Sequence, residues 1–252
     1  MQDLSRTLTV LADGDPVAGF TRARLTGTDA VGLFPMPFRL RLWNLPDKNP
    51  LTAAKEISVL HDGSVLASGT VSDVFRRAVP EGTVTEVLFS AGLRLWEAPV
   101  SLSVEAGVTV SETVRRILSA SGTGLPLLSF PGEDPVRVRG QAFSGRAAEC
   151  VTSALSAAGA RACLTPSGLC VIPSSGLPVS MTLTEHDLTD VPVRAGSNLL
   201  VLRTKVAGWP LGKTVSVQWQ GETAEGLVTE RSVDADSAEG SWETEILMEV
   251  TL

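Results

Sequence analysis

Two short helical patterns inside a chain that otherwise alternates like β-strands most strongly limit what this sequence can fold into. The first, residues 109–122, opens with a capping box from Thr109 to Glu112 and ends at Gly122. The second, residues 144–159, has one apolar stripe and ends at Gly159. Each helix is only about three turns long and would not persist alone. We therefore expect both helices to pack on a sheet or on each other.

The segments on either side of these helices are typical of β-strands. The clearest strand is residues 37–45, where Phe38, Leu40 and Leu42 fall on one face. The chain is therefore predicted to be mainly β with a small α/β middle. We predict three regions, a β domain over 1–98, a middle segment with two short helices over 99–175, and a second β domain over 176–252.

The other face of residues 37–45 carries Arg39, Arg41 and Trp43. A tryptophan on a face otherwise made of arginines indicates contact with a neighbouring domain or subunit. Equally, it can cover the edge of a sheet. We take these three residues as the candidate subunit or domain contact.

Composition excludes several classes of protein. The apolar content of 43% excludes a disordered chain. The net charge of −7 argues against general nucleic-acid binding, which needs a basic footprint. Residues 176–252 carry 5 basic and 12 acidic side chains, so this region holds the whole net charge. The longest charge-free run, residues 162–184, is broken by prolines and glycines, so we expect no membrane span.

One segment resembles a phosphate-binding loop. Residues 207–214 place Gly-Lys-Thr at the correct spacing, but phosphate binding needs a helix to follow directly. Here Val215, Val217 and Trp219 alternate as in a strand, and Pro210 removes one amide from the loop. We interpret the segment as a turn between strands.

Other candidate sites are equally weak. No nucleophile motif accompanies the two histidines, His61 and His186, which we interpret as solvated loop residues. The acidic loop 234–240 resembles a fragment of a calcium loop but lacks the third early ligand and the turn glycine, so a solvated tip is the simpler interpretation. Glu243, Glu245 and Glu249 share one face of the last strand, as in a charged sheet edge. We predict no catalytic residues, no cofactor and no metal.

The order of these segments resembles the baseplate hub proteins of phage tails and related contractile injection machines. The resemblance rests on residues 37–45, on 106–114 with the helix that follows, on 144–172, and on 210–217. It implies two tail-tube-like β-barrel domains flanking the middle segment. It also implies a structural, non-enzymatic virion protein of the tail baseplate, assembled in the host cytoplasm. Its implied partners are two further copies in a homotrimeric ring, the hexameric tail tube protein, the trimeric central spike protein, and the tape measure or other baseplate proteins.

Two alternatives to a hub remain at this point. One is a monomeric β-rich module that binds sugar or protein. The other is a tail-associated polysaccharide or peptidoglycan hydrolase, which would need acidic or His/Ser groups converging in one pocket.

Overall fold

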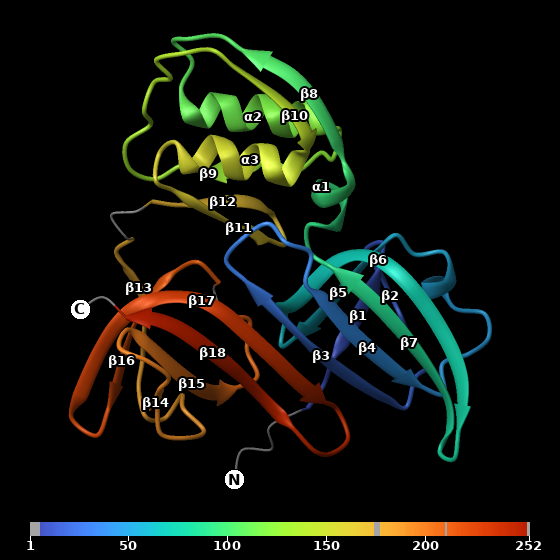
Figure 1. The fold of residues 1–252 in the computed structure, drawn as a ribbon. Helices are drawn as coiled ribbons and strands as arrows, with labels where there is room; N and C mark the ends of the chain where they lie inside the picture. Colours follow the sequence, from blue (N-terminus) through green and yellow to red (C-terminus); the bar gives the residue numbers. More distant parts are fainter. Residues whose placement is uncertain (1–5, 174–176, 210, 251–252) are drawn as a thin grey trace.

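The computed structural model describes residues 6–173, 177–209 and 211–250, and these form a mainly β protein, as the sequence predicts (Figure 1). The helices are α1 (Leu93–Glu97), α2 (Val110–Ser121), α3 (Ala147–Ser156) and a short 3-10 helix (Pro50–Thr52). The strands of the first region are β1 (Thr9–Ala12), β2 (Asp15–Pro16), β3 (Arg22–Ala30), β4 (Pro37–Trp43), β5 (Glu56–His61), β6 (Ser64–Val79) and β7 (Gly82–Ser90). Those of the middle are β8 (Pro99–Val104), β9 (Leu127–Ser129), β10 (Gln141–Arg146), β11 (Arg161–Thr165) and β12 (Gly168–Ile172). Those of the last region are β13 (Val179–Leu183), β14 (Val193–Arg194), β15 (Leu199–Lys205), β16 (Thr214–Trp219), β17 (Glu222–Asp236) and β18 (Trp242–Val250).

One sheet runs through both β regions, which corrects the prediction of two separate barrels. Its path is β14-β15-β18-β17-β3-β4-β7-β6-β5-β1-β2, with β16 pairing β17 and β13 pairing β16. The two regions join where β3 pairs antiparallel with residues 230–236 of β17. Over the described residues the path has free ends, so it is not closed into a barrel. The reason is that β3 has β4 on one edge and β17 on the other.

The two β regions follow the same plan. The first region runs β3-β4-β7-β6-β5-β1 and the last runs β14-β15-β18-β17-β16-β13. Each contains one long strand, β6 or β17, whose first half pairs with the preceding strand of its hairpin. The direction of one outer strand differs, because β1 is antiparallel to β5 whereas β13 is parallel to β16. We call these two sets of strands the first and second β repeats.

Local details of the long strands agree between the repeats. Gly69 in β6 and Gly226 in β17 both lie against the neighbouring strand, where a Cβ would come within 2.3 Å of the Ser90 backbone and 2.4 Å of the Glu249 carbonyl oxygen. Three residues later each strand has a bulge, at Ser72 and at Thr229.

The hydroxyl at each bulge is used in the same way. Ser72 donates to the carbonyl of Leu88 at 3.1 Å, and Thr229 donates to that of Leu247 at 3.2 Å. The partner strands carry matching sequences, Thr-Glu-Val-Leu at 85–88 and Thr-Glu-Ile-Leu at 244–247. The two repeats therefore align residue by residue.

The middle region contains the two predicted helices. Helix α2 agrees with the prediction, since the Thr109 side chain accepts from the Glu112 amide and Gly122 ends the helix in a left-handed conformation. The Glu112 carboxylate binds Arg116 at 3.1 Å. Helix α3 begins at Ala147, later than predicted, because residues 141–146 pair with β8. Figure 1 shows both helices between the β8–β10 pair and the sheet of β9, β11 and β12.

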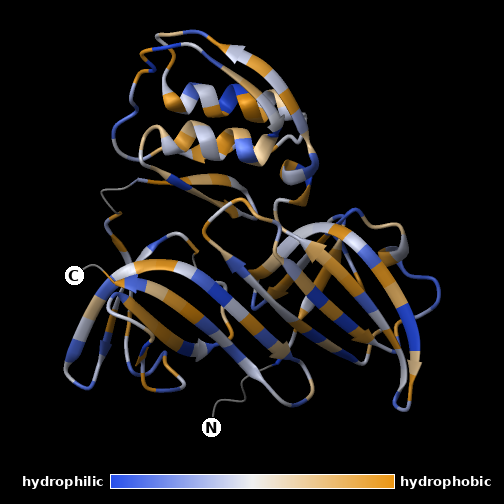
Figure 2. Ribbon diagram, in the orientation of Figure 1, coloured by the Kyte–Doolittle hydropathy of each residue, from blue (hydrophilic) through white to orange (hydrophobic). Residues whose placement is uncertain are grey.

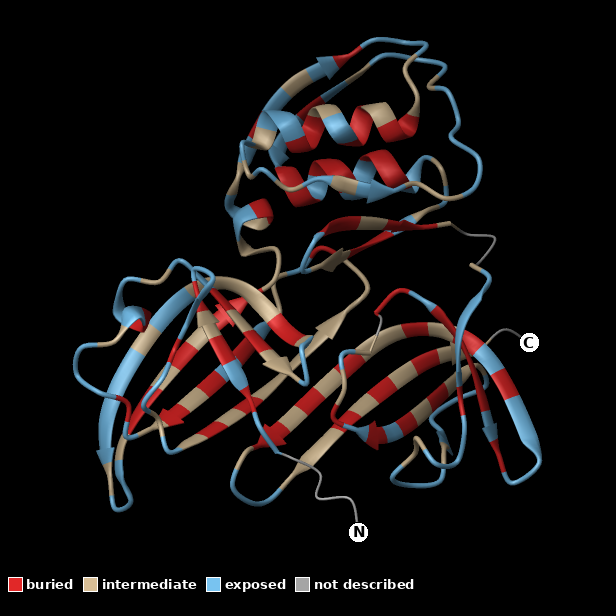
Figure 3. Ribbon diagram, turned by 180° about the vertical axis from the view of Figure 1, so that it is seen from behind, coloured by how far each residue is buried: buried red, intermediate tan, exposed pale blue. Residues whose placement is uncertain are grey.

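Apolar side chains form three buried clusters, centred on the first repeat, the middle region and the second repeat. Figure 2 shows the alternation of apolar and polar residues along the strands, and Figure 3 shows buried residues on the facing sides of α2 and α3. Some residues cross the predicted regions, since Val233 and Ala235 of β17 pack in the first cluster and Leu33 packs in the second. The boundaries at 98/99 and 175/176 stay predictions.

Candidate interaction surface on the shared sheet

The three candidate contact residues lie together on the outer face of β4. Phe38, Leu40 and Leu42 alternate with them and are buried beneath the sheet. Arg39 is exposed, while Arg41 and Trp43 are half-buried. The period of two in the sequence therefore places the charged and apolar faces correctly.

Both arginines already have a partner within the chain. Glu86 of β7 lies opposite Arg41, and its side chain is only 14% exposed. Arg41 Nε donates to the Glu86 carboxylate at 2.8 Å, and Arg39 Nε lies 3.3 Å from its other oxygen. The same pairing recurs in the second repeat, where Arg203 Nε donates to Glu245 at 3.1 Å. This cross-strand ion pair therefore belongs to the plan shared by the repeats.

Trp43 contacts an arginine of β3 that also binds β17. We call the paired strands β3 and β17, where the two repeats meet, the seam. The guanidinium of Arg22 lies 4.7 Å from the Trp43 ring centroid. Arg22 also binds Asp236 of β17 through two hydrogen bonds, of 2.9 and 2.5 Å. Whether Arg39, Arg41 and Trp43 contact another subunit stays a prediction.

Asp236 and Asp234 lie in β17, which corrects their assignment to a solvated loop. Each aspartate binds an arginine of β3, Asp236 to Arg22 and Asp234 to Arg24 at 3.0 Å. Burial, the largest influence on Asp236, raises its pKa. The hydrogen bonds from Arg22 and from the Ala238 and Glu239 amides outweigh it, so the pKa of Asp236 lies below its usual value.

A third ion pair between β3 and β17 has both side chains largely buried. Arg231 of β17 donates through Nε and Nη2 to the two oxygens of Asp29 of β3, at 2.7 and 2.8 Å. Its third nitrogen donates to the Trp209 carbonyl at 3.0 Å. The Arg231 side chain is 8% exposed and that of Asp29 16%. Sequence reasoning missed this pair because the partners are 202 residues apart.

The candidates for chemistry do not form a site. Residues 214–219 form β16, so a strand follows the Gly-Lys-Thr segment as predicted, while Pro210 lies outside the described residues. His61 is not solvated, since it ends β5 with its ring 5.1 Å from that of Trp242 and edge-on to it. Over residues 6–173, 177–209 and 211–250, no group of three acidic, histidine or cysteine side chains is placed to hold a metal.

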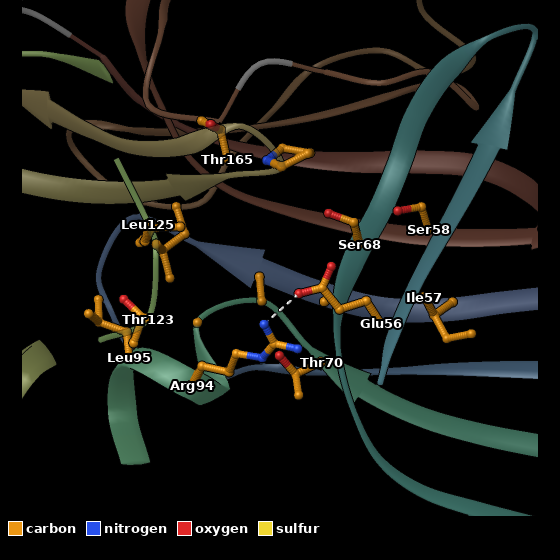
Figure 4. A pocket seen from close by; sticks show the side chains of 15 residues that line it. Glu56, Ile57, Ser58, Ser68, Thr70, Arg94, Leu95, Thr123, Leu125 and Thr165 are labelled. Atoms are coloured by element: carbon orange, nitrogen blue, oxygen red, sulfur yellow. Dashed lines mark ion pairs between the residues drawn. The ribbon is translucent and has the colours of Figure 1, made fainter. Parts of the chain in front are cut away.

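A small cavity lies where the first repeat meets the middle region. It has a volume of about 180 Å³ and is lined by residues of β5, β6, α1 and the β11–β12 turn (Figure 4). Arg94 of α1 and Glu56 of β5 form an ion pair of 3.0 Å within it. The described lining residues include no histidine or cysteine, and the carboxylate of Glu56 is bound by Arg94.

Solved structures share this architecture. A tail protein from Neisseria meningitidis MC58 has a TM-score of 0.68 at 13% sequence identity, covering 96% of this chain and 95% of that one. The 43 kDa tail protein of prophage MuSo2 from Shewanella oneidensis has the same TM-score and coverage at 12% identity. The chain has the fold of these tail proteins.

A third similar structure comes from a secretion system. The E. coli c3393 protein, a component of the type VI secretion system with structural similarity to the T4 bacteriophage tail proteins gp27 and gp5, has a TM-score of 0.69 at 11% identity. The match covers 96% of this chain and 77% of that one. No family model and no curated protein matches the sequence. Among the described helices, none is both long and apolar enough to cross a membrane.

Proposed function

We propose that this chain is the structural hub of a phage tail baseplate or a related injection machine. Three copies form a ring that joins the hexameric tail tube protein to the trimeric central spike protein. The chain acts without catalysis and without a cofactor, and it resides in the virion tail after assembly in the host cytoplasm. The tape measure protein and other baseplate proteins are its further partners.

The observation that carries this proposal is the pair of equivalent β repeats in one chain. Three chains would present six repeats, which matches the sixfold symmetry expected of a tail tube on one side while leaving threefold symmetry for a spike on the other. The similarity to phage tail proteins over 96% of the chain supports the same role. An uneven charge fits a protein with different partners on its two sides, because residues 176–252 carry 12 acidic and 5 basic side chains and so account for the whole net charge of −7.

The first test is the mass of the purified protein in solution over a range of concentrations, with negative-stain images of the same samples. A trimer with a ring-shaped outline and a central hole is expected. A strict monomer without rings at high concentration contradicts the hub and favours the binding module.

The contact role of β4 is tested in the same assay by reversing the charges of Arg39 and Arg41 to glutamate together. Loss of the ring is expected if this face contacts another subunit. A double reversal at Arg115 and Arg116 on α2 is the matched control, because those side chains are exposed and lie on the middle region. Intact rings in the β4 variant would remove Arg39 and Arg41 from the contact.

A further inference from the structure

The second half of β6 has an unused sheet edge. Residues 64–70 of β6 pair with β5, and residues 70–79 pair with β7 on the opposite edge. The Val71 amide on the β5 edge donates to the Lys55 carbonyl at 2.9 Å, and among the described residues no strand pairs with the same edge of residues 72–79. Phe75 on this segment is 47% exposed, and Figure 3 shows this end of the hairpin as exposed. Unpaired amides and carbonyls on such an edge can accept a further strand.

The second repeat contains the same edge with a strand bound to it. Ser72 and Thr229 occupy the same bulge, so residues 73–79 of β6 correspond to residues 230–236 of β17. In β17 this segment pairs with β3 over its whole length. The chain therefore displays, in its own second repeat, the kind of strand that fits this edge.

The strand that fits is the first strand of a repeat. In the first repeat that strand is β3, and its counterpart in the second repeat is β14, which pairs with β15 as β3 pairs with β4. Strand β14 lies at the end of the sheet path, with nothing paired to its outer edge among the described residues. Val191 and Val193 on this segment are 52% and 59% exposed.

We propose that residues 191–196 of one copy of this chain add as a strand to residues 72–79 of β6 in a second copy. The contact repeats between chains the pairing that β3 and β17 make within the chain. It rests on the proposed function in that it names the surface through which hub subunits would join. Because the two surfaces differ, the contact is head-to-tail, and it can close into a ring.

Charged residues lie on and beside the two edges. The β6 segment carries Arg76 and Arg77, whereas the chain leading into β14 carries Glu185, Asp187 and Asp190. Within the chain, basic β3 meets acidic β17 through Arg22 and Arg24. The added strand itself, residues 191–196, carries Arg194 and no acidic residue, so between chains any attraction would come from the acidic segment 185–190 beside the strand.

The alignment of the repeats also gives a register. Arg41 corresponds to Arg203, since each lies opposite the matching glutamate, and this places Val193 at the position of Thr26. Thr26 lies opposite Asp234, whose counterpart in β6 is Arg77. Val193 of one copy should therefore lie directly opposite Arg77 of the next.

Disulfide cross-linking of the full chain tests this register. The double variant Arg77→Cys, Val193→Cys is expected to form disulfide-linked dimers and trimers under mild oxidation, about tenfold faster than the control, because neighbouring chains hold the thiols together. The matched control is Arg77→Cys, Val138→Cys, since Val138 is 90% exposed on the middle region. Each single variant controls for the native Cys150, Cys163 and Cys170.

A second measurement follows the native edge without new cysteines. Hydrogen exchange at residues 72–79 is expected to slow as protein concentration rises. The variant Val193→Lys, which places a second positive charge opposite Arg77, is expected to abolish that slowing. A trimer that forms without preferential cross-linking and without this protection overturns the edge assignment and leaves the hub proposal standing. A monomer at every concentration, with neither signal, overturns both.

Discussion

In the second β repeat the end of the long strand β17 pairs with a strand on each edge. In the first repeat, over the described part of the chain, the end of β6 pairs with a strand on one edge only. The two strands otherwise share a glycine, a bulge and a hydroxyl contact at matching positions. The covered strand carries aspartates and a buried arginine bound to β3, while the open strand carries Arg76, which binds Asp47 and the Leu45 carbonyl, and Arg77, which lies 3.8 Å from Glu86. The two long strands therefore share a backbone plan and differ in the chemistry of one edge.

The largest expected loss of stability is at the edge of β17 that pairs with β3. Asp29→Ala leaves the buried guanidinium of Arg231 without its carboxylate, so the free energy of unfolding should fall by about 3–5 kcal/mol. Urea denaturation measures this loss. Asp190→Ala is the control, because that side chain is 61% exposed and its ion pair should contribute less than about 1 kcal/mol. Equal losses in both variants would mean that the seam adds no special stability.

The shared glycines come next. Gly69→Ala and Gly226→Ala each push a Cβ into the backbone of the neighbouring strand, and each should cost about 2 kcal/mol. Gly196→Ala is the control, since a Cβ there would meet its nearest atom at 4.0 Å. Urea denaturation of the three variants at low concentration decides whether the two repeats respond alike. A neutral result at only one of the two glycines would break the structural equivalence at that position.

Low pH should weaken the contact between β3 and β17 by protonating Asp236. Because the pKa of Asp236 is lowered in the folded protein, its contribution is fully present above the ordinary aspartate pKa of about 3.9 and is lost as the pH falls further. Unfolding free energies of the wild type and Asp236→Asn should therefore differ at neutral pH and converge at low pH. A difference that stays constant down to about pH 2 would contradict this role.

The smallest expected loss of stability comes from the ion pairs on the outer faces of the two repeats. Glu86→Gln removes the charge bound by Arg39 and Arg41 from a side chain that is 14% exposed, and should cost about 1 kcal/mol. Glu245→Gln, at the matching position but 46% exposed, should cost about 0.5 kcal/mol or less. Thermal melts at low and high salt check both values. The reverse order would show that exposure does not control these pairs.

The sequence predicted the local parts of this fold well. Alternation around Phe38, Leu40 and Leu42 placed the buried face of β4, and the Thr109 cap and Gly122 placed helix α2. These signals lie within a few residues of each other, so periodicity and capping are enough to read them. The start of α3 was placed too early because the strand pairing of residues 141–146 with β8 leaves little mark on a helix-like composition.

The seam between the repeats was not predicted because its partners lie far apart in the chain. The alternating aspartates at 234 and 236 resemble a loop until Arg22 and Arg24 are known to lie opposite. One readable signal was missed. The pattern Ala-x-Gly-x-Val-Ser/Thr-Asp/Glu occurs at 67–73 and at 224–230, and it marks the matching glycine and bulge of the two repeats.

The pairing of β3 with β17 also has a consequence for how the chain folds. Arg22 and Asp236 are separated by 214 positions, so β3 leaves the ribosome long before its partner strand exists. Non-local pairing of this kind is slow, since the entropy of closing a long loop is lost before the contact forms. During synthesis one edge of β3 therefore stays unpaired until β17 has been made. If the middle segment folds in that interval, it would bring β17 close to β3.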